Sequence, residues 1–368
     1  MAGGVDTTRP AHAGRLGYQP GLDGLRAIAI LTVLVFHVGA FAGETTLRGG
    51  FLGVQIFFVI SGFLITALLF EEWNRNGRIR LGYFYVRRAL RLFPALFAAV
   101  AVALIYASFA PRDQLHPTAR EALASIFYWD NWFHGLNVGN PTILLHTWSL
   151  SIEEQFYLVW PIVLILALSL AAVRSRLWVI PLAAAVASAL GRATVSLSES
   201  HVNSRLYFGT DTRADALLIG CMLALLWARG LPRGAVRLIA WLCLPAVAGL
   251  AVLMWFENVP DRSLYVIGLF GCALASGIVI ANVVTGRPAV VGHLLSHPWL
   301  VFVGKISYGL YLWHYIVFWI VRDHTDGWSQ WARVPLEVGL AFAVALASYH
   351  VLELPIVRKK ARFTPLRG

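Results

Sequence analysis

Long apolar runs, separated by shorter polar segments, extend along most of the chain. Each run reaches the length of about 20 residues that an α-helix needs to cross the hydrocarbon core of a bilayer. The pattern therefore predicts ten membrane-spanning helices. They are residues 24–43, 51–70, 90–110, 146–170, 177–195, 211–228, 236–256, 263–284, 299–321 and 333–353. A further segment, 120–134, is too polar for a span and predicts an interfacial or re-entrant helix.

Composition agrees with this pattern, because 58% of the 368 residues are apolar and only 13% are charged. Soluble domains usually have about 25% charged residues. We therefore expect an all-α integral membrane protein, a bundle of about ten transmembrane helices with lipid as its surroundings. The net charge of +11 could indicate nucleic acid. Basic residues of membrane proteins, however, gather in cytoplasmic loops beside anionic lipid, so we expect no nucleic-acid partner.

The placement of Lys and Arg predicts the orientation of the bundle. With the N-terminus in the cytoplasm, 21 of the 30 Lys and Arg residues fall on the cytoplasmic side. This bias follows the positive-inside rule, and ten spans then bring both termini to the cytoplasm. The chain divides into a polar, disordered leader (1–18), a membrane domain (19–357) and a basic cytoplasmic tail (358–368).

The first apolar run, "LRAIAILTVLVFHVG", contains a cation and an imidazole. His37 follows Arg26 by eleven positions, which at about 100° per residue puts both side chains on one helix face, about 16 Å apart along the axis. His37 falls near the middle of the membrane. It could be a neutral imidazole that stabilises helix packing, or a base or acyl carrier in a polar cavity. Arg26 taken alone is better explained by extension toward lipid headgroups.

Two further segments combine polar residues at helical spacing. In "HTWSLSIEEQFYLVWP", Ser149, Glu153 and Tyr157 share a face, so Glu153 is a candidate for a cavity wall, where it could orient a histidine; a solvated carboxylate is the alternative. In the segment after the second span, Arg88 and Arg91 are i, i+3 neighbours. They are either a positive-inside anchor or a clamp for a phosphorylated ligand.

Other polar residues within apolar runs are weaker candidates for a cavity wall. Arg213 is expected to pair with one of its neighbouring aspartates or to extend to the interface. The small residues around Gly62 predict close helix packing. These candidates are Gln55, Ser61, Arg213, Asp215, Tyr311 and His314.

No phosphate-binding loop and no metal-ligand spacing of His, Asp, Glu or Cys is present. The three cysteines lie within apolar runs and are expected to be core residues. We therefore expect no metal and no tightly bound cofactor.

Taken in order, several of these motifs resemble the acyltransferase-3 family of bacterial membrane O-acyltransferases. The resemblance rests on Arg26 and His37 with ten residues between them, on the Arg88/Arg91 pair, and on six short stretches. These stretches are distributed between about residue 19 and residue 357. These stretches are "GLDGLRAIAILTVLVFH", "GVQIFFVISGFLI", "HTWSLSIEEQFYLVWP", "TRADALLIG", "ISYGLYLWH" and "YHVLELP".

The resemblance implies ten core helices in the bacterial cytoplasmic membrane and a cytosolic acyl-CoA donor, most simply acetyl-CoA, as co-substrate. The acceptor would be a hydroxyl of a cell-envelope glycan, a lipid-linked sugar or a macrolide-type metabolite. His37 and Arg26 become the essential pair, Glu153 the matching carboxylate, and Arg88 and Arg91 candidates for the donor's phosphates.

The sequence thus favours an O-acyltransferase in which His37 accepts a proton or carries the acyl group, and Glu153 orients its imidazole. The alternative is a protein that catalyses no acyl transfer, a proton-coupled transporter of a polar solute, since intramembrane polar groups also line transport paths. An assembly scaffold would tolerate loss of both His37 and Glu153.

Overall fold

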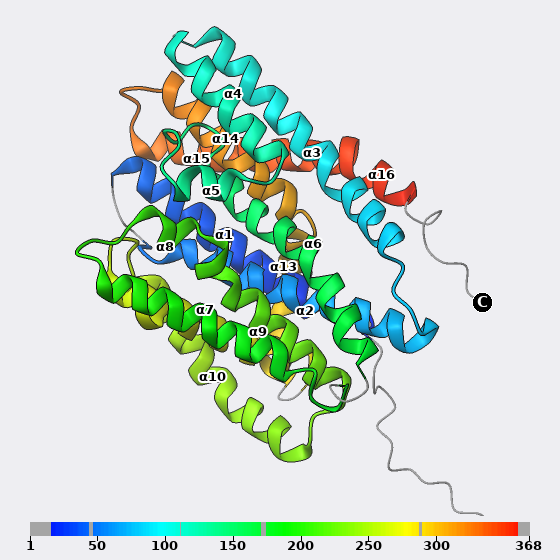
Figure 1. The fold of residues 1–368 in the computed structure, drawn as a ribbon. Helices are drawn as coiled ribbons and strands as arrows, with labels where there is room; N and C mark the ends of the chain where they lie inside the picture. The colour runs from blue at the N-terminus through cyan, green and yellow to red at the C-terminus, as the bar shows by residue number, and fades with distance from the viewer. Residues whose placement is uncertain (1–15, 44–46, 111, 171–173, 287–288, 360–368) are drawn as a thin grey trace, which may run out of the picture.

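The computed structural model describes residues 16–43, 47–110, 112–170, 174–286 and 289–359, and all regular structure in these ranges is helical. The α-helices follow one another in a single bundle (Figure 1). They are α1 (Pro20–Ala42), α2 (Gly53–Asn76), α3 (Leu81–Phe109), α4 (Arg112–Ile126), α5 (Asp130–Gly135), α6 (Trp148–Ser169), α7 (Val179–Ser198), α8 (Ser204–Phe208), α9 (Thr210–Ala228), α10 (Arg233–Phe256), α11 (Leu269–Thr285), α12 (Ala289–Leu295), α13 (Pro298–Lys305), α14 (Ser307–His324), α15 (Gln330–Ser348) and α16 (Leu354–Lys359).

A helix stands at each of the ten predicted spans, which confirms a multi-pass, all-α membrane protein. Eight of the described helical segments are long and apolar enough to cross a membrane, and α13 with α14 forms a ninth that is bent by 67°. The remaining predicted span, α9, carries three charged residues in its first two turns, Asp211, Arg213 and Asp215. The count of ten and the side on which the termini lie stay predictions.

Three details differ from the sequence prediction. The span expected at 299–321 is broken after Lys305, so that α14 starts at Ser307 in a new direction. The helix expected to begin at residue 90 begins at Leu81. Arg88 therefore lies on the same helix as Arg91, because the amphipathic first turns continue the apolar part. The segment at 120–134 forms two short helices, α4 and α5, joined where Tyr128 adopts a positive φ of 54°.

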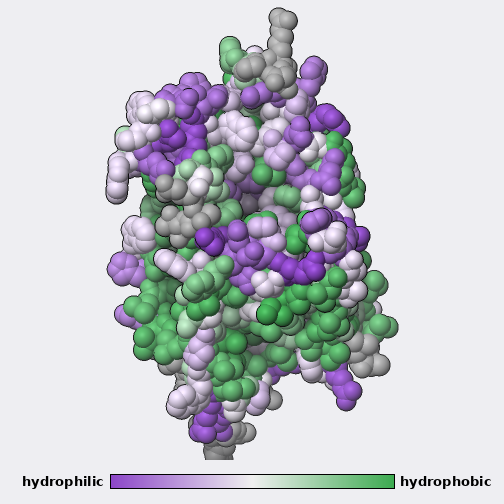
Figure 2. Space-filling model, turned by 90° about the vertical axis from the view of Figure 1, so that its left-hand side faces the viewer, coloured by the Kyte–Doolittle hydropathy of each residue, from purple (hydrophilic) through white to green (hydrophobic). Residues whose placement is uncertain are grey.

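The two ends of the bundle differ in what they carry. We call the end that holds the start of α1, the end of α2 and the start of α3 the near end, and the opposite end the far end. The described chain begins and finishes at the near end, on the right of Figure 1. The far end holds α4, α5 and the start of α6. Figure 2 faces the far end, with hydrophilic residues over its upper part and across its middle and an apolar surface below.

Helices α2 and α9 pack closely because glycines let their backbones meet. A Cβ added to Gly62 would lie 1.9 Å from the backbone oxygen of Leu217, and one added to Gly220 would lie 2.1 Å from that of Val59. The Cys221 thiol also donates a hydrogen bond to the Gly62 carbonyl, at 3.5 Å. Small residues at such crossings replace the hydrophobic driving force that is absent between helices in lipid. The close packing predicted around Gly62 is thereby confirmed.

This contact predicts that Gly62→Ala destabilises the bundle. The new methyl group would force α2 and α9 apart, at a cost of about 1–3 kcal/mol, and thermal unfolding of the detergent-solubilised protein should show a lower Tm. Gly191→Ala is the matched control, since it adds a methyl to the exposed face of α7 with no atom within 4 Å. Equal Tm values for the two variants would contradict the assignment.

Candidate functional site

A cavity of about 610 Å³ lies between α1, α2, α3, α6 and α14. Its near-end part is lined by charged residues from the end of α2 and the start of α3, and its inner part by residues from the start of α6 and the start of α14. Eight residues singled out in the sequence line it. They are Arg26, Ser61, Arg88, Arg91, Ser149, Glu153, Tyr157 and Tyr311.

Glu153 lies in the wall of this cavity, on α6. The Ser61 hydroxyl, on α2, donates a 2.5 Å hydrogen bond to Glu153 Oε1. Arg88 and Arg26 are the cations that act on this carboxylate electrostatically. Its described contacts do not include His37, so the structure gives the His37 imidazole a different partner from the one expected.

The two arginines of α3 differ in what they bind. Arg88 Nε donates a 2.8 Å hydrogen bond to Glu154 Oε1, and its guanidinium carbon lies 3.2 Å from the centre of the Tyr157 ring. Arg91 and Arg26 make no hydrogen bond and no ion pair within the described residues. Arg88 is thus held by Glu154 and Tyr157, whereas the guanidinium N–H donors of Arg26 and Arg91 are available to an anion in the cavity.

At the inner end of the cavity, two hydroxyls meet. The Ser149 and Tyr311 oxygens lie 2.6 Å apart, and Tyr311 Oη donates to the backbone carbonyl of His146 at 2.8 Å. Because that proton goes to the carbonyl, Ser149 is the donor in the hydroxyl pair. The contact joins α6 to α14 at the inner wall.

Directly behind Tyr311 lies a pair of histidines. His314 Nδ1 lies 2.6 Å from the Tyr311 carbonyl oxygen, which can only accept, so Nδ1 carries the proton and Nε2 is a bare acceptor. His37 Nδ1 lies 3.0 Å from the Val33 carbonyl oxygen and 3.1 Å from His314 Nε2. It therefore donates to both, which leaves the lone pair of His37 on Nε2. His314 is fully buried and His37 partly exposed, and neither lines the cavity.

His146, which no sequence pattern predicted as a site residue, is a third imidazole beside this pair. Its Nε2 donates to the Leu312 carbonyl at 2.9 Å, and its ring lies 5.7 Å from that of His314 and stacks on Tyr315. The motif "HTWSLSIEEQFYLVWP" starts at His146, so the motif could have pointed to this residue as part of the site.

Besides the two histidines, three predicted residues lie away from the cavity wall. Gln55 is buried and donates to the Leu269 carbonyl at 3.2 Å. Arg213 was expected to pair with a neighbouring aspartate or to extend to the interface, and this is wrong. Asp215 pairs with Arg192 at 2.8 Å, Asp211 pairs with Arg205, and the buried guanidinium of Arg213 makes no hydrogen bond. Arg213 instead faces the aromatic rings of Trp148 and Tyr207.

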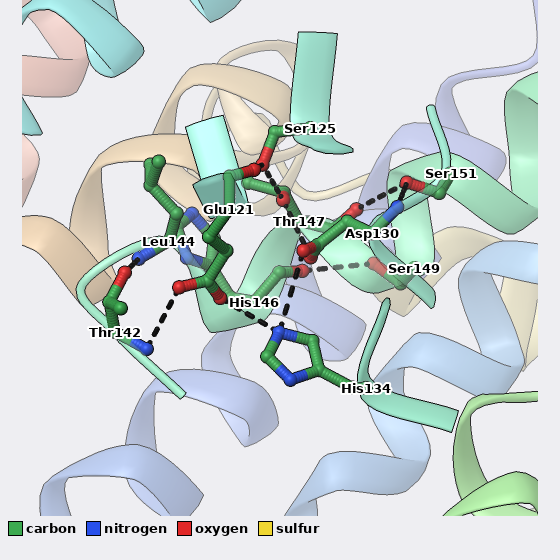
Figure 3. Close-up of polar contacts among 10 residues, drawn as sticks. All are labelled: Glu121, Ser125, Asp130, His134, Thr142, Leu144, His146, Thr147, Ser149 and Ser151. Atoms are coloured by element: carbon green, nitrogen blue, oxygen red, sulfur yellow. Dashed lines mark hydrogen bonds and ion pairs between the residues drawn. The ribbon is translucent and has the colours of Figure 1, made fainter. Parts of the chain in front are cut away.

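A second polar cluster, at the far end, went unnoticed in the sequence (Figure 3). Glu121 of α4 and Asp130 and His134 of α5 are all buried, and one nitrogen of His134 faces both carboxylates. Burial raises the pKa of Asp130 to about 6. Burial alone would lower the pKa of His134, but the Asp130 and Glu121 carboxylates that face its ring raise this pKa to about 9. The i, i+4 spacing of Asp130 and His134 was the available indication, and Glu121 lies on another helix.

These geometries can be compared with known proteins. Residues 19–351 match the family described as acyltransferase domain. O-acetyltransferase OatA of Staphylococcus aureus (strain NCTC 8325 / PS 47) is 35% identical over 354 residues, which are 93% of this chain and 58% of that protein. A protein of Bacillus subtilis (strain 168), named "Putative peptidoglycan O-acetyltransferase YrhL", is 35% identical over 353 residues, 92% of this chain and 55% of its own length.

The chain thus spans somewhat more than half the length of these relatives. No solved structure matches it. The match of the family over nearly the whole membrane bundle agrees with the resemblance carried by Arg26, His37 and the motifs that follow them. The chain belongs to the acyltransferase domain family.

Proposed function

We propose that the protein is a membrane-bound O-acyltransferase that moves an acetyl group from acetyl-CoA to a hydroxyl of a cell-envelope glycan. The observation that carries this proposal is the cavity at the near end, with two arginines on its wall that make no hydrogen bond or ion pair among the described residues, and the Tyr311–His314–His37 series behind its inner end. The names of the relatives support acetyl as the group and peptidoglycan as the glycan.

The donor site follows from the charges at the near end. Coenzyme A carries a diphosphate and a ribose phosphate, and guanidinium groups bind such oxygens with paired hydrogen bonds. Arg26 and Arg91 have this capacity available, while Arg88 is held by Glu154 and Tyr157. The thioester arm would then extend inward along the cavity toward Ser149 and Tyr311. With the near end in the cytoplasm, this places the donor where acetyl-CoA is made.

In the proposed reaction, His37 is the general base. Its Nε2 lone pair takes the proton of the acceptor hydroxyl while that oxygen attacks the thioester carbonyl. The carbon–sulfur bond breaks, the coenzyme A thiolate leaves, and the proton on His37 returns to that sulfur. The product is an O-acetyl ester plus the free thiol, so atoms and charge balance. His314 acts through His37, because its bare Nε2 holds the proton of His37 on Nδ1.

The acceptor is expected to approach from the far end. His37 lies in the last turns of α1, is partly exposed and is absent from the cavity wall. Glu153 has a different role from the one first expected, since it balances the charge of Arg26 and Arg88 on the donor side. The transporter alternative would need no thioester, and no observation on the described residues favours it.

We predict that His37→Ala lowers acetyl transfer by about 10²–10⁴-fold, the usual contribution of a general base.

His314→Gln should lower kcat by about tenfold with an unchanged KM for acetyl-CoA, because about 1.4 kcal/mol of tautomer preference is lost. Transfer of radiolabelled acetyl from acetyl-CoA to a peptidoglycan fragment in proteoliposomes measures both. His201→Ala, on an exposed loop, is the control. A folded His37→Ala protein with full activity would refute the mechanism.

We also predict that Arg91→Ala raises the KM for acetyl-CoA by about 10–100-fold, since a charged hydrogen bond contributes about 1.5–3 kcal/mol. The kcat at saturating donor should change little. Arg78→Ala removes an exposed cation from the same end of the bundle without altering the cavity wall, and its KM should equal that of the wild type. Equal effects of the two variants would point to general surface charge rather than a donor site.

A further inference from the structure

The far-end cluster of Glu121, Asp130 and His134 lies outside the cavity and takes no part in the proposed reaction. All three side chains are buried, with Glu121 and Asp130 fully so. They come from α4 and α5, on the segment that precedes the start of α6 (Figure 3). Two carboxylates in a buried place need compensating charge, because an isolated buried ion is expensive.

One atom of each of the three side chains lies close enough to the other two for all three to be candidate ligands of one metal ion. His134 Nε2 lies 2.8 Å from Glu121 Oε1 and 3.4 Å from Asp130 Oδ1, and one ligand atom from each residue lies within 4.8 Å of the others. Ligands with bonds of about 2.0–2.2 Å to Zn²⁺ stand about 3–3.5 Å apart. The two distances from His134 Nε2 to the carboxylate oxygens therefore lie close to the separation of neighbouring ligands around such an ion.

A single hydrogen on His134 Nε2 cannot satisfy both carboxylate oxygens that face this nitrogen. His134 Nε2 can carry one hydrogen, and at 2.8 Å this hydrogen belongs to Glu121 Oε1. Asp130 Oδ1 is then a fully buried carboxylate oxygen that faces the same nitrogen without a hydrogen bond. Leaving such an atom unsatisfied costs about 1–3 kcal/mol or more. A divalent cation would bind all three inner atoms and neutralise both carboxylates.

The outer oxygens are held as they are in metal sites. Glu121 Oε2 accepts from the Thr142 amide at 2.9 Å, and Asp130 Oδ2 accepts from the Thr147 hydroxyl at 2.9 Å. Ser125 in turn contacts the Thr147 hydroxyl at 2.7 Å. Such outer contacts fix the direction of the free lone pairs of metal-binding carboxylates. Here they leave one oxygen of each carboxylate pointing to His134.

We propose that Glu121, Asp130 and His134 bind one divalent transition-metal cation of the Zn²⁺ class, with a water molecule as the remaining ligand. Neutral His134 would supply Nε2 and each carboxylate one oxygen. The ion is structural, because it ties α4 and α5 to the start of α6 through Thr147, one residue after His146. It performs no step of the proposed acetyl transfer, and its binding can be measured in a protein that transfers nothing.

The test is metal analysis of the purified full-length protein in detergent. After incubation with zinc chloride and dialysis, we expect about one zinc per chain by mass spectrometry. A chelator should remove it and lower the Tm, and zinc chloride should restore the Tm. His134→Gln should lose the zinc and the response to chelator. His116→Gln, an exposed histidine on α4, should keep both.

Results on the unmodified protein decide the proposal if the His134 variant does not fold. A folded wild-type protein that retains no zinc, and whose Tm responds neither to chelator nor to zinc chloride, would overturn it. The cluster would then be a proton-shared triad of one imidazolium and two carboxylates. Zinc that is retained equally by the wild type and by a folded His134→Gln protein would overturn it as well.

Discussion

Lipid supplies no hydrogen bonds, so each buried polar side chain of this bundle must find its partner within the protein. The structure meets this constraint with long-range pairs. Arg192 of α7 bonds the Tyr265 and Thr212 carbonyls and pairs with Asp215, which ties α7 to α9 and to the turn before α11. On the other side of the bundle, Arg322 and Glu337 join α14 to α15 at 2.6 Å. These pairs fix where the helices stand.

Against this background, the polar groups without partners are informative. Arg26 and Arg91 on the cavity wall have no hydrogen bond or ion pair among the described residues, although charged neighbours on the same wall are compensated. Asp130 Oδ1 is a fully buried acceptor with no hydrogen bond. A group that is left unsatisfied at a cost is a candidate for a ligand that is absent from the structure. The two proposals, an anionic donor and a divalent cation, both rest on this reasoning.

The sequence predicted what depends on one helix at a time. Apolar runs located the spans, and helical geometry placed Arg26 and His37 on one face of α1. The sequence alone could not predict contacts between different helices. The partner of His37 is His314, 277 residues away, and that of Glu153 is Ser61, 92 residues away. No period or motif encodes these distances.

The same limit explains the missed far-end cluster. Glu121 and Asp130 are brought together because the chain turns at Tyr128, with a positive φ that few non-glycine residues adopt. Nothing in the polar pattern of 120–134 predicts this turn. The break after Lys305 was likewise hidden, because the apolar run continues through it.

The segment 146–149, where α6 begins, connects the two proposed sites. Thr147 donates to Asp130 in the far-end cluster, the carbonyl of His146 accepts from Tyr311, and Ser149 donates to the Tyr311 hydroxyl at the inner end of the cavity. Tyr311 in turn supplies the carbonyl that fixes the tautomer of His314 and, through it, that of His37. An ion in the far-end cluster would therefore hold the segment that positions the proposed base, without touching either substrate.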